Sequence, residues 1–240
     1  MSKVQNREEL LEAYKILRVA DVRDGMDTLL LHRTGTMSPD VRPIWRTRAM
    51  GIARTVLCVP YTGDELPKDM SPDQYMKWSD RYYQEVCPYP WINEIEPGDF
   101  IVIDQSGVDA GLMGSNNTLA GIRHGARGYV SNGGVRDTDE LILQKVPFWS
   151  VFISQKMVQC RLAYKAHNLP VTVSGVLVNP GDVVVADGDG VIVVPQEAAQ
   201  DVAFYALAER RRDMRERRNH YSALGLPMDE TVWNDVDAPK

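Results

Sequence analysis

The sequence predicts one α/β domain, residues 1–240, with a helical N-terminal region and a C-terminal helix. Three observations lead to this fold class. No stretch is rich enough in Pro, Gly or Ser to separate two domains, and 240 residues suffice to bury one α/β core. From residue 97 onward, short continuous apolar segments alternate with turn residues, as buried strands do. Apolar residues at helical spacing flank this region on both sides.

The N-terminal elements follow from the spacing of apolar residues. Helices are predicted at residues 7–18 and 21–32, and a strand is predicted at residues 51–61, where a proline and a Thr-Gly-Asp turn end it. Residues 62–95 predict a helical excursion inserted into the domain. Its helix begins at Ser71, because a capping hydroxyl, a proline and an acid succeed one another there. Two later prolines end it.

Two segments in the second half of the chain repeat one pattern. Residues 97–104 (PGDFIVID) and residues 180–187 (PGDVVVAD) each consist of a tight turn, a buried strand and a final aspartate. Four further strands are predicted, at residues 128–132, 149–154, 171–178 and 190–195. Residues 196–218 predict a single C-terminal helix.

Composition narrows the class of protein. The formal net charge of −6 argues against nucleic-acid and membrane partners, because binding to either needs a positive field around the protein. No apolar run reaches the roughly 18 residues that span a bilayer, and the first residues lack the apolar core of a signal peptide. The three cysteines, Cys58, Cys87 and Cys160, form neither a disulfide framework nor a zinc pattern. We therefore expect a cytoplasmic protein with buried or half-buried thiols.

The segment that carries chemistry lies between residues 111 and 143. A glycine-containing turn opens a helix that ends at Gly125, a strand follows, and Gly133-Gly134 leads through Arg136-Asp137 into another helix. The glycines allow backbone torsions and close approach that a β-carbon would prevent. Helix starts at the ends of strands are where open α/β sheets place ligands.

Asp137 has two interpretations at this stage. It is either a helix cap, with Glu140 at capping-box spacing, or a ligand for a hard divalent cation. The planar guanidinium group of Arg136 directs its N–H donors into the same crevice. The helix start at residues 114–117 offers unpaired N–H groups to a small anion. A cation on Asp137 would polarise a 2-oxo group and stabilise an enolate.

At these residues the chain resembles a known family. The run from Gly128 to Glu140 is similar to the signature of the 4-hydroxy-4-methyl-2-oxoglutarate/4-carboxy-4-hydroxy-2-oxoadipate aldolases and the regulator of ribonuclease activity A. Gly114, with 21 residues between it and Arg136, matches the glycine of the family's substrate-binding loop. Residues 180–195 resemble the family's C-terminal hairpin, and the resemblance covers about residues 95–200.

The resemblance implies a swivelling β/β/α-type fold and a homotrimer or homohexamer with sites at subunit interfaces. It implies a class II pyruvate aldolase that also decarboxylates oxaloacetate and depends on a divalent metal, Mg²⁺ first and Mn²⁺ as the alternative. In this picture Asp137 binds the metal, Glu140 supports its water shell, and Arg136 binds the pyruvate moiety of a small 2-oxo acid. Backbone amides at the loop hold the carboxylate, and their residues are Gly114, Ser115, Asn116 and Asn117.

The resemblance has one departure and one rival function. Many aldolases of the family have an acid just after the loop glycine, where this chain has Ser115-Asn116-Asn117. Residues of the 62–95 excursion and of a neighbouring subunit are expected to read the second carbonyl product. The rival is a non-catalytic regulator that binds an RNA-processing enzyme. The Arg136-Asp137 pair favours the enzyme, because a pure binding protein has no use for it.

Other charged motifs have ordinary structural interpretations. Residues 209–218 hold six arginines among three acids, which indicates a salt-bridged helix end more than an RNA-contacting helix. Residues 187–190 (DGDG) are typical of a hairpin turn and lack the later ligands of a calcium loop. Asp21, Asp24 and Asp27 suggest a cap and surface acids. Nothing marks Lys145, Lys156 or Lys165 as a Schiff-base lysine, and there is no nucleotide-binding G-x-G-x-x-G.

Overall fold

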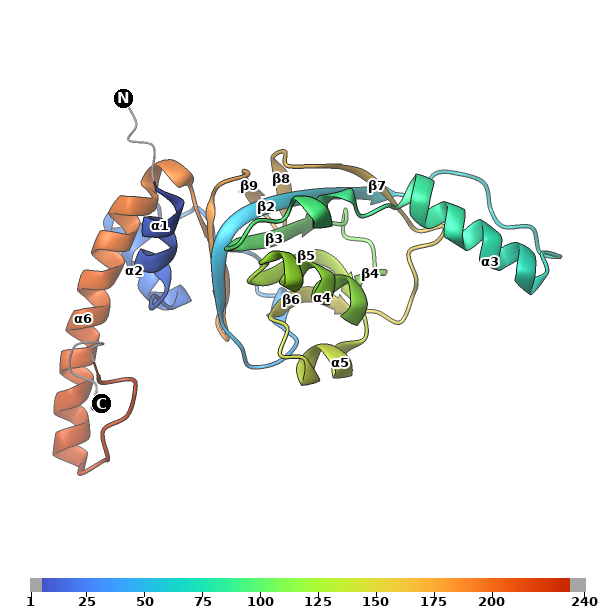
Figure 1. The fold of residues 1–240 in the computed structure, drawn as a ribbon. Coiled ribbons are helices and arrows are strands. Elements are labelled where there is room, and N and C mark those ends of the chain that lie inside the picture. The colour runs from blue at the N-terminus through green and yellow to red at the C-terminus, as the bar shows by residue number, and fades with distance from the viewer. Residues whose placement is uncertain (1–5, 234–240) are drawn as a thin grey trace.

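The computed structural model describes residues 6–233, and its centre is a nine-stranded sheet with the order β1–β6–β5–β3–β2–β10–β11 (Figure 1). Strand β4 pairs with β5, and β7 pairs with β2. Strands β2 to β6 form the parallel part, whereas β1, β7, β10 and β11 join in antiparallel fashion. The strands are β1 (Arg42–Pro43), β2 (Ala49–Pro60), β3 (Asp99–Asp104), β4 (Gly111–Met113), β5 (Gly128–Val135), β6 (Phe148–Ile153), β7 (Leu162–His167), β10 (Val183–Asp187) and β11 (Gly190–Val194).

Helices and a small hairpin cover the sheet in layers. Alternate residues of β3 show the two faces: Ile101 and Ile103 pack toward α4, α5 and the excursion, while Phe100 and Val102 pack under the hairpin β8–β9. A third apolar cluster joins α1, α2 and α6 to β10 and β11. The elements are α1 (Arg7–Tyr14), α2 (Val19–Thr28), α4 (Ser115–His124), α5 (Thr138–Leu143), β8 (Val171–Val173), β9 (Val176–Val178) and α6 (Ala199–Leu224). The predicted α/β class with a C-terminal helix is confirmed.

The excursion at residues 62–95 is helical, as predicted. It contains α3 (Pro72–Arg81), a π-helical turn (Tyr82–Val86) and a 3-10 helix (Pro90–Glu94). Ser71 caps α3, since its hydroxyl accepts from Gln74 N–H at 3.3 Å and its N–H donates to the Gln74 side chain at 2.8 Å. Helix α3 buries none of its residues and extends away from the sheet (Figure 1). The excursion is therefore attached to the domain by the residues after α3.

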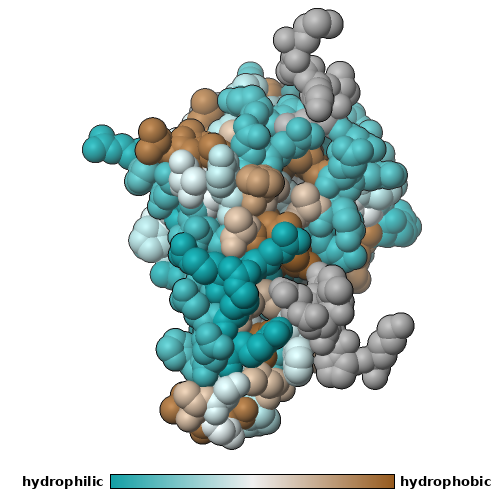
Figure 2. All heavy atoms as spheres, turned by 90° about the vertical axis from the view of Figure 1, so that its left-hand side faces the viewer, coloured by the Kyte–Doolittle hydropathy of each residue, from teal (hydrophilic) through white to brown (hydrophobic). Residues whose placement is uncertain are grey.

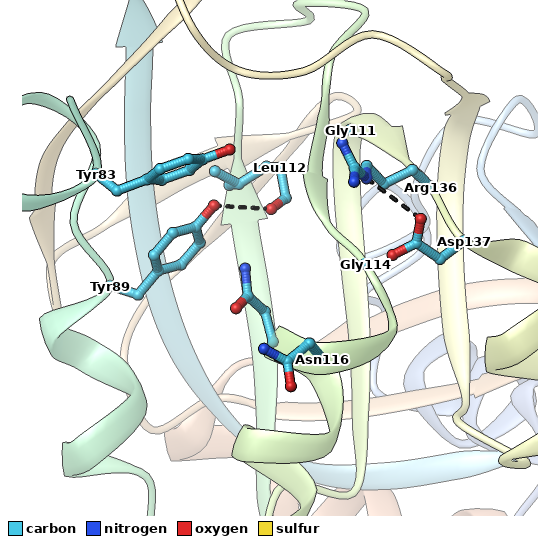
Figure 3. Close-up of a pocket in the computed structure, with 9 residues that line it drawn as sticks. Tyr83, Tyr89, Gly111, Leu112, Gly114, Asn116, Arg136 and Asp137 are labelled. Atoms are coloured by element: carbon cyan, nitrogen blue, oxygen red, sulfur yellow. Dashed lines mark hydrogen bonds and ion pairs between the residues drawn. The ribbon is translucent and has the colours of Figure 1, made fainter. Parts of the chain in front are cut away.

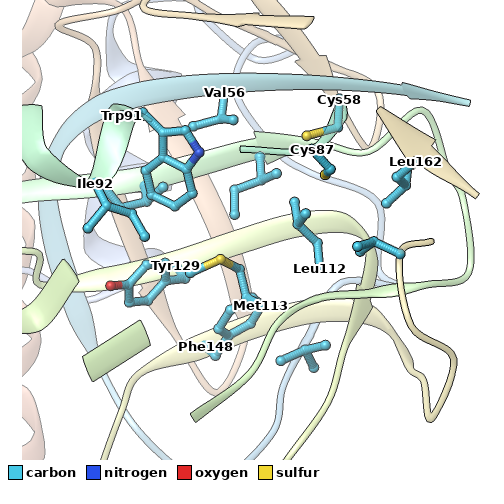
Figure 4. Packing of buried hydrophobic residues seen from close by; sticks show 14 of the residues in the cluster. Val56, Cys58, Cys87, Trp91, Ile92, Leu112, Met113, Tyr129, Phe148 and Leu162 are labelled. Carbon is cyan, nitrogen blue, oxygen red and sulfur yellow. The ribbon is translucent and has the colours of Figure 1, made fainter. Parts of the chain in front are cut away.

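Those later residues enter the core on the α4 side of the sheet (Figure 4). Trp91 and Cys87 are fully buried there beside Cys58 of β2. Tyr129 stacks on Phe148 deeper in the same cluster, with ring centroids 5.5 Å apart. Cys58, Cys87 and Cys160 are free thiols, the first two buried and the third half-buried, as expected. This packing holds the end of the excursion firmly against the sheet.

Helices α1 and α2 each end four residues before their predicted ends, and three further predicted boundaries were wrong. Residues 171–178 are a hairpin and not one strand, because Ser174 and Gly175 turn the chain with φ of 47° and 87°. Strand β5 runs through Gly133 and Gly134 to Val135, three residues beyond its predicted end. Helix α6 starts at Ala199 after a 3-10 turn and continues to Leu224, whose following Gly225 adopts the left-handed conformation.

The charged motifs take the structural roles expected of them. Asp21 accepts the N–H of Arg18 at 2.8 Å and forms ion pairs with Arg18 and with Arg210 of α6. Arg212 pairs with Glu209 in the arginine-rich part of α6. The face of the molecule formed by this helix is mostly hydrophilic (Figure 2). Residues 187–190 form the β10–β11 turn, and none of the helices within residues 6–233 is long and apolar enough to cross a bilayer.

The two Pro-Gly-Asp turns are built alike and are anchored by buried carboxylates. Asp99 accepts the N–H of Glu96, and Asp182 accepts the N–H of Asn179, each at 2.8 Å. Asp99 also pairs with Arg7 at 2.6 Å and Arg54 at 2.5 Å while only 2% exposed. The turn before β3 is thus tied to α1 and β2.

Asp99→Ala should lower the free energy of unfolding by about 3 kcal/mol, because it leaves buried donors and a partly buried arginine without their acceptor. Urea denaturation followed by circular dichroism measures this loss. Asp109→Asn, which alters an exposed pair with Lys156, is the control and should change stability little. Equal losses in the two variants would contradict the role given to Asp99.

Candidate active site

A cavity of about 380 Å³ lies where β4, the start of α4, the end of β5 and the excursion meet (Figure 3). It brings together most of the residues that the sequence singled out, and it adds four others. The predicted lining residues are Gly114, Asn116, Asn117, Arg136 and Asp137. The added ones are Tyr83, Tyr89, Gly111 and Leu112. Segments that are far apart in the sequence therefore line one cavity.

The pairing of β4 with β5 places the Arg136-Asp137 motif at this cavity. Gly111 lies opposite Gly134 in parallel register, and the chain leaves the sheet directly after Val135. The β5 glycines are needed for close packing and not for unusual torsions, which corrects half of the expectation. A β-carbon on Gly133 would lie 2.5 Å from the Gln105 side chain, and one on Gly134 would lie 2.7 Å from the Ala110 carbonyl oxygen.

Asp137 occupies the N-cap position of α5, but its side chain does not cap that helix. Its φ of 56° is left-handed, an uncommon conformation for a non-glycine residue. Asp137 Oδ2 instead accepts the N–H of Ser115 at 3.1 Å, and Oδ1 accepts from Arg136 Nε at 3.3 Å. The cap interpretation is wrong, because the carboxylate is directed at the first turn of α4 and at the cavity. Its side chain is 33% exposed.

Two glycines make room for this charged pair. A β-carbon on Gly114 would lie 2.3 Å from Asp137 Oδ2, far inside van der Waals contact. A β-carbon on Gly111 would lie 2.8 Å from Cβ and Cγ of Arg136, so the arginine stem lies directly on that backbone. Gly114 itself is extended, with φ of −136° and ψ of −171°, and any residue can adopt that backbone. Space, not torsion, requires glycine at position 114.

The first turn of α4 leaves donors open toward the cavity. Ser115 N–H goes to Asp137, and Thr118 N–H goes to the Gly114 carbonyl at 3.1 Å. The N–H groups of Asn116 and Asn117 have no acceptor within the described part of the chain. Free N–H groups at the positive end of a helix dipole suit a carboxylate. Two N–H groups without an acceptor therefore lie at the start of α4, on residues that line the cavity together with Arg136.

The opposite wall is aromatic and comes from the excursion (Figure 3). The rings of Tyr83 and Tyr89 are stacked, with centroids 6.4 Å apart and an interplanar angle of 27°. The Tyr89 hydroxyl donates to the Leu112 carbonyl at 3.0 Å. Burial raises the pKa of both tyrosines, so both are neutral phenols at physiological pH. No local motif marks these tyrosines in the sequence, and only the general expectation for the excursion anticipated them.

The donor set suits a hard divalent cation held mainly by water and substrate. Within residues 6–233 there is no group of three His, Cys, Asp or Glu side chains that could enclose a metal. Asp137 offers one carboxylate to the cavity, and one carboxylate with waters is a common way for proteins to bind Mg²⁺. Glu140 is exposed on α5 and does not line the cavity, so a role for it through water remains a prediction. Lys156 pairs with Asp109 away from the cavity.

Solved structures of other proteins share this fold. A crystal structure of a protein from Pseudomonas syringae superposes with a TM-score of 0.71 and 25% identity, covering 96% of this chain and 100% of that one. RraAS2 of Streptomyces coelicolor, described as an unusual member of the RNase ES inhibitor RraA protein family, gives a TM-score of 0.71 over 90% of this chain and 98% of its own. At 24% identity, the latter likeness concerns the fold.

The chain belongs to the RraA-like family, described as Aldolase/RraA, whose profile matches residues 19–193. Protein DlpA of Legionella pneumophila is 32% identical over 52% of this chain and 20% of its own length. A Deinococcus radiodurans protein named "Putative 4-hydroxy-4-methyl-2-oxoglutarate aldolase" is 33% identical over 42% of this chain and 63% of its own. The chain thus spans less than two thirds of these curated relatives.

Gly114→Ala should displace the Asp137 carboxylate from Ser115 while leaving the fold intact, because alanine tolerates the extended backbone but its β-carbon does not fit. Nuclear magnetic resonance of the Ser115 amide measures this, and its signal should shift as the hydrogen bond is lost. The control is Ala120→Gly, which exchanges the same two residue types on the same helix. Gly107→Ala would not serve as a control, because the φ of Gly107 is 70° and alanine would be strained there. An unshifted Ser115 amide in Gly114→Ala would contradict the crowding argument.

Proposed function

We propose that this protein is a divalent-metal-dependent lyase that cleaves a 4-hydroxy-2-oxo acid to pyruvate and a second carbonyl compound. One observation carries the proposal: the Asp137 carboxylate and the Arg136 guanidinium lie together at the open N-terminus of α4, inside a cavity. The names of the aldolase relatives agree with a lyase. A site with an anion-binding end and a single carboxylate for a cation fits a 2-oxo acid.

Each group has a distinct part in the reaction. Arg136 and the N–H groups of Asn116 and Asn117 hold the carboxylate and 2-oxo end of the substrate. Asp137 would hold Mg²⁺ or Mn²⁺, and the bound cation would supply a Lewis acid for the 2-oxo group. The 4-hydroxyl loses its proton, the C3–C4 bond breaks, and its electron pair becomes the enolate of pyruvate, which takes a proton at C3. Arg136 stabilises the negative charge that develops. Loss of CO₂ from oxaloacetate gives the same enolate.

A non-catalytic regulator remains the second candidate function. It is favoured by the RraAS2 structure, whose description names an RNase inhibitor family. The cavity with its Arg136-Asp137 pair favours the enzyme, because surface recognition of a protein partner does not require a charged pair that lines a cavity. The two functions differ in whether small 2-oxo acids are turned over.

Asp137→Asn and Arg136→Ala should each lower kcat/KM for oxaloacetate and for 4-hydroxy-4-methyl-2-oxoglutarate by about 10²–10³-fold. Arg136→Ala removes a positive charge that stabilises the enolate, and Asp137→Asn weakens the binding of the cation that would stabilise it. Pyruvate release with Mg²⁺, with Mn²⁺ and with EDTA measures this, and the chelator should abolish turnover by the wild type. Asp139→Asn, an exposed neighbour outside the cavity, is the matched control. Turnover that resists EDTA and both site variants would exclude the proposed chemistry.

We also propose that the protein assembles as a homotrimer or homohexamer with the sites at subunit interfaces. The support is a set of exposed apolar side chains beside the site. Phe152 and Ile153 of β6 lie opposite Gly134 and Val135, directly before Arg136, and Ile153 is 71% exposed. Leu143 at the end of α5 is 82% exposed. Apolar surface of this kind is typical of protein interfaces.

Ile153→Arg should therefore dissociate the assembly and lower activity together, because it places a charge in an apolar contact. Multi-angle light scattering gives the mass, and the oxaloacetate assay gives the activity. Phe204→Arg on the distant α6, where Phe204 is 70% exposed, should change neither. A monomeric wild type with full activity would refute the interface proposal while leaving the chemistry standing.

A further inference from the structure

The cavity has two chemically different ends (Figure 3). At one end Arg136 and Asp137 lie beside the open N–H groups of α4. At the other end the lining consists of tyrosine rings from the excursion and of Leu112. A substrate whose carboxylate is bound by Arg136 therefore extends its remaining atoms toward the tyrosines. The second wall decides which substrate fits, since it contacts the part that becomes the second product.

The tyrosine wall is rigid enough to select a shape. Tyr89 is fixed by its hydrogen bond to the Leu112 carbonyl and by its ring contact with buried Trp91, at 6.3 Å between centroids. Tyr83 packs against Tyr89 and against buried Tyr82, at 6.4 and 6.5 Å between centroids. What this wall offers is two aromatic rings held in place by ring contacts to buried residues. Aromatic groups pack favourably against such rings, edge to face or offset.

The charges that this chain supplies disfavour an acidic tail at the same wall. Arg136 is the one cationic side chain among the nine residues that line the cavity. It faces the pyruvate end and is already paired with Asp137. The basic residues of the excursion nearest in sequence, Lys77 and Arg81, line a separate hollow with Trp78. A second carboxylate at the far end would lose its hydration without gaining a cation from this chain, which is unfavourable.

Resting on the proposed function, we infer that Tyr83 and Tyr89 are specificity-determining residues for an uncharged aromatic tail. The preferred substrate is a 4-hydroxy-2-oxo monocarboxylate with an aryl group on C4, and the second product is an aromatic aldehyde. For 4-hydroxy-2-oxo-4-phenylbutanoate, the hydroxyl proton leaves, the C3–C4 bond breaks and C4 becomes the carbonyl carbon of benzaldehyde. C3 gains a proton to give pyruvate, so the reaction balances without an oxidant or reductant. A cavity of about 380 Å³ is within the range of small-molecule sites.

The first measurement is binding, which does not depend on turnover. Calorimetry compares 2-oxo-4-phenylbutanoate with 2-oxoglutarate, two 2-oxo acids that lack the 4-hydroxyl and differ in the charge of the tail. We expect the phenyl compound to bind at least tenfold more tightly to the wild-type protein with Mg²⁺. Equal affinity, or tighter binding of 2-oxoglutarate, would overturn the inference.

The second measurement is selectivity, the ratio of kcat/KM for 4-hydroxy-2-oxo-4-phenylbutanoate to that for 4-hydroxy-4-methyl-2-oxoglutarate. Tyr83→Leu should lower this ratio about tenfold, mainly through KM, and Tyr83→Phe should restore it because the ring is kept. Tyr83→Arg should reverse the preference, since it gives an acidic tail a cation. Tyr75→Leu is the matched control, because Tyr75 lies on α3 outside the cavity and should leave the ratio unchanged.

The outcomes separate the two proposals. Metal-dependent turnover of oxaloacetate together with a preference for the diacid would overturn the aromatic specificity and leave the lyase standing. Selective binding of the phenyl compound without turnover of any 2-oxo acid would overturn the lyase and leave the recognition standing. A ratio that Tyr83→Leu and Tyr75→Leu lower equally would show that the excursion acts through folding, and would refute a specific role for Tyr83.

Discussion

The contact on which the site depends is the hydrogen bond from Ser115 N–H to the carboxylate of Asp137, made across Gly114. It joins Asp137, just after β5, to Ser115 at the start of α4, and these two residues are 22 positions apart in the sequence. A carboxylate is favourable at a helix N-terminus, where N–H groups are unsatisfied and the dipole is positive. To reach it, Asp137 adopts a left-handed backbone that costs free energy, and residue 114 must lack a side chain.

The same contact organises the neighbouring charges. Because Asp137 takes the first N–H of α4, the next two are left for another anion, and Arg136 lies along the bare backbone of Gly111. The positive groups therefore lie on one side of the cavity, with a single carboxylate among them. A site with one negative and several positive groups can bind a cation and an acidic substrate together, because the charges of these two ligands offset each other.

Much of this could be predicted from sequence, for a local reason. Gly114, Arg136 and Asp137 lie within one β-α-β unit, so their spacing encodes their proximity. Sequence left two interpretations of Asp137 open because its position is that of a cap, while its side-chain direction depends on a left-handed torsion that sequence does not reveal. Tyr83 and Tyr89 were missed individually because their approach to Leu112 is a long-range contact without periodic or motif-like signal.

The attachment of the excursion has a consequence for divergence within the family. The Arg136-Asp137 pair and the open N–H groups of α4 lie on one short continuous stretch, whereas the facing wall comes from the excursion, whose outer helix buries none of its residues. The outer helix α3 can change in length or sequence at little cost to folding, because exposed segments tolerate replacement, whereas the residues around Tyr83 and Tyr89 are packed into the core. The exposed part of the excursion could therefore diverge among relatives, or be redesigned, without disturbing the tyrosine wall or the segment that carries Arg136 and Asp137.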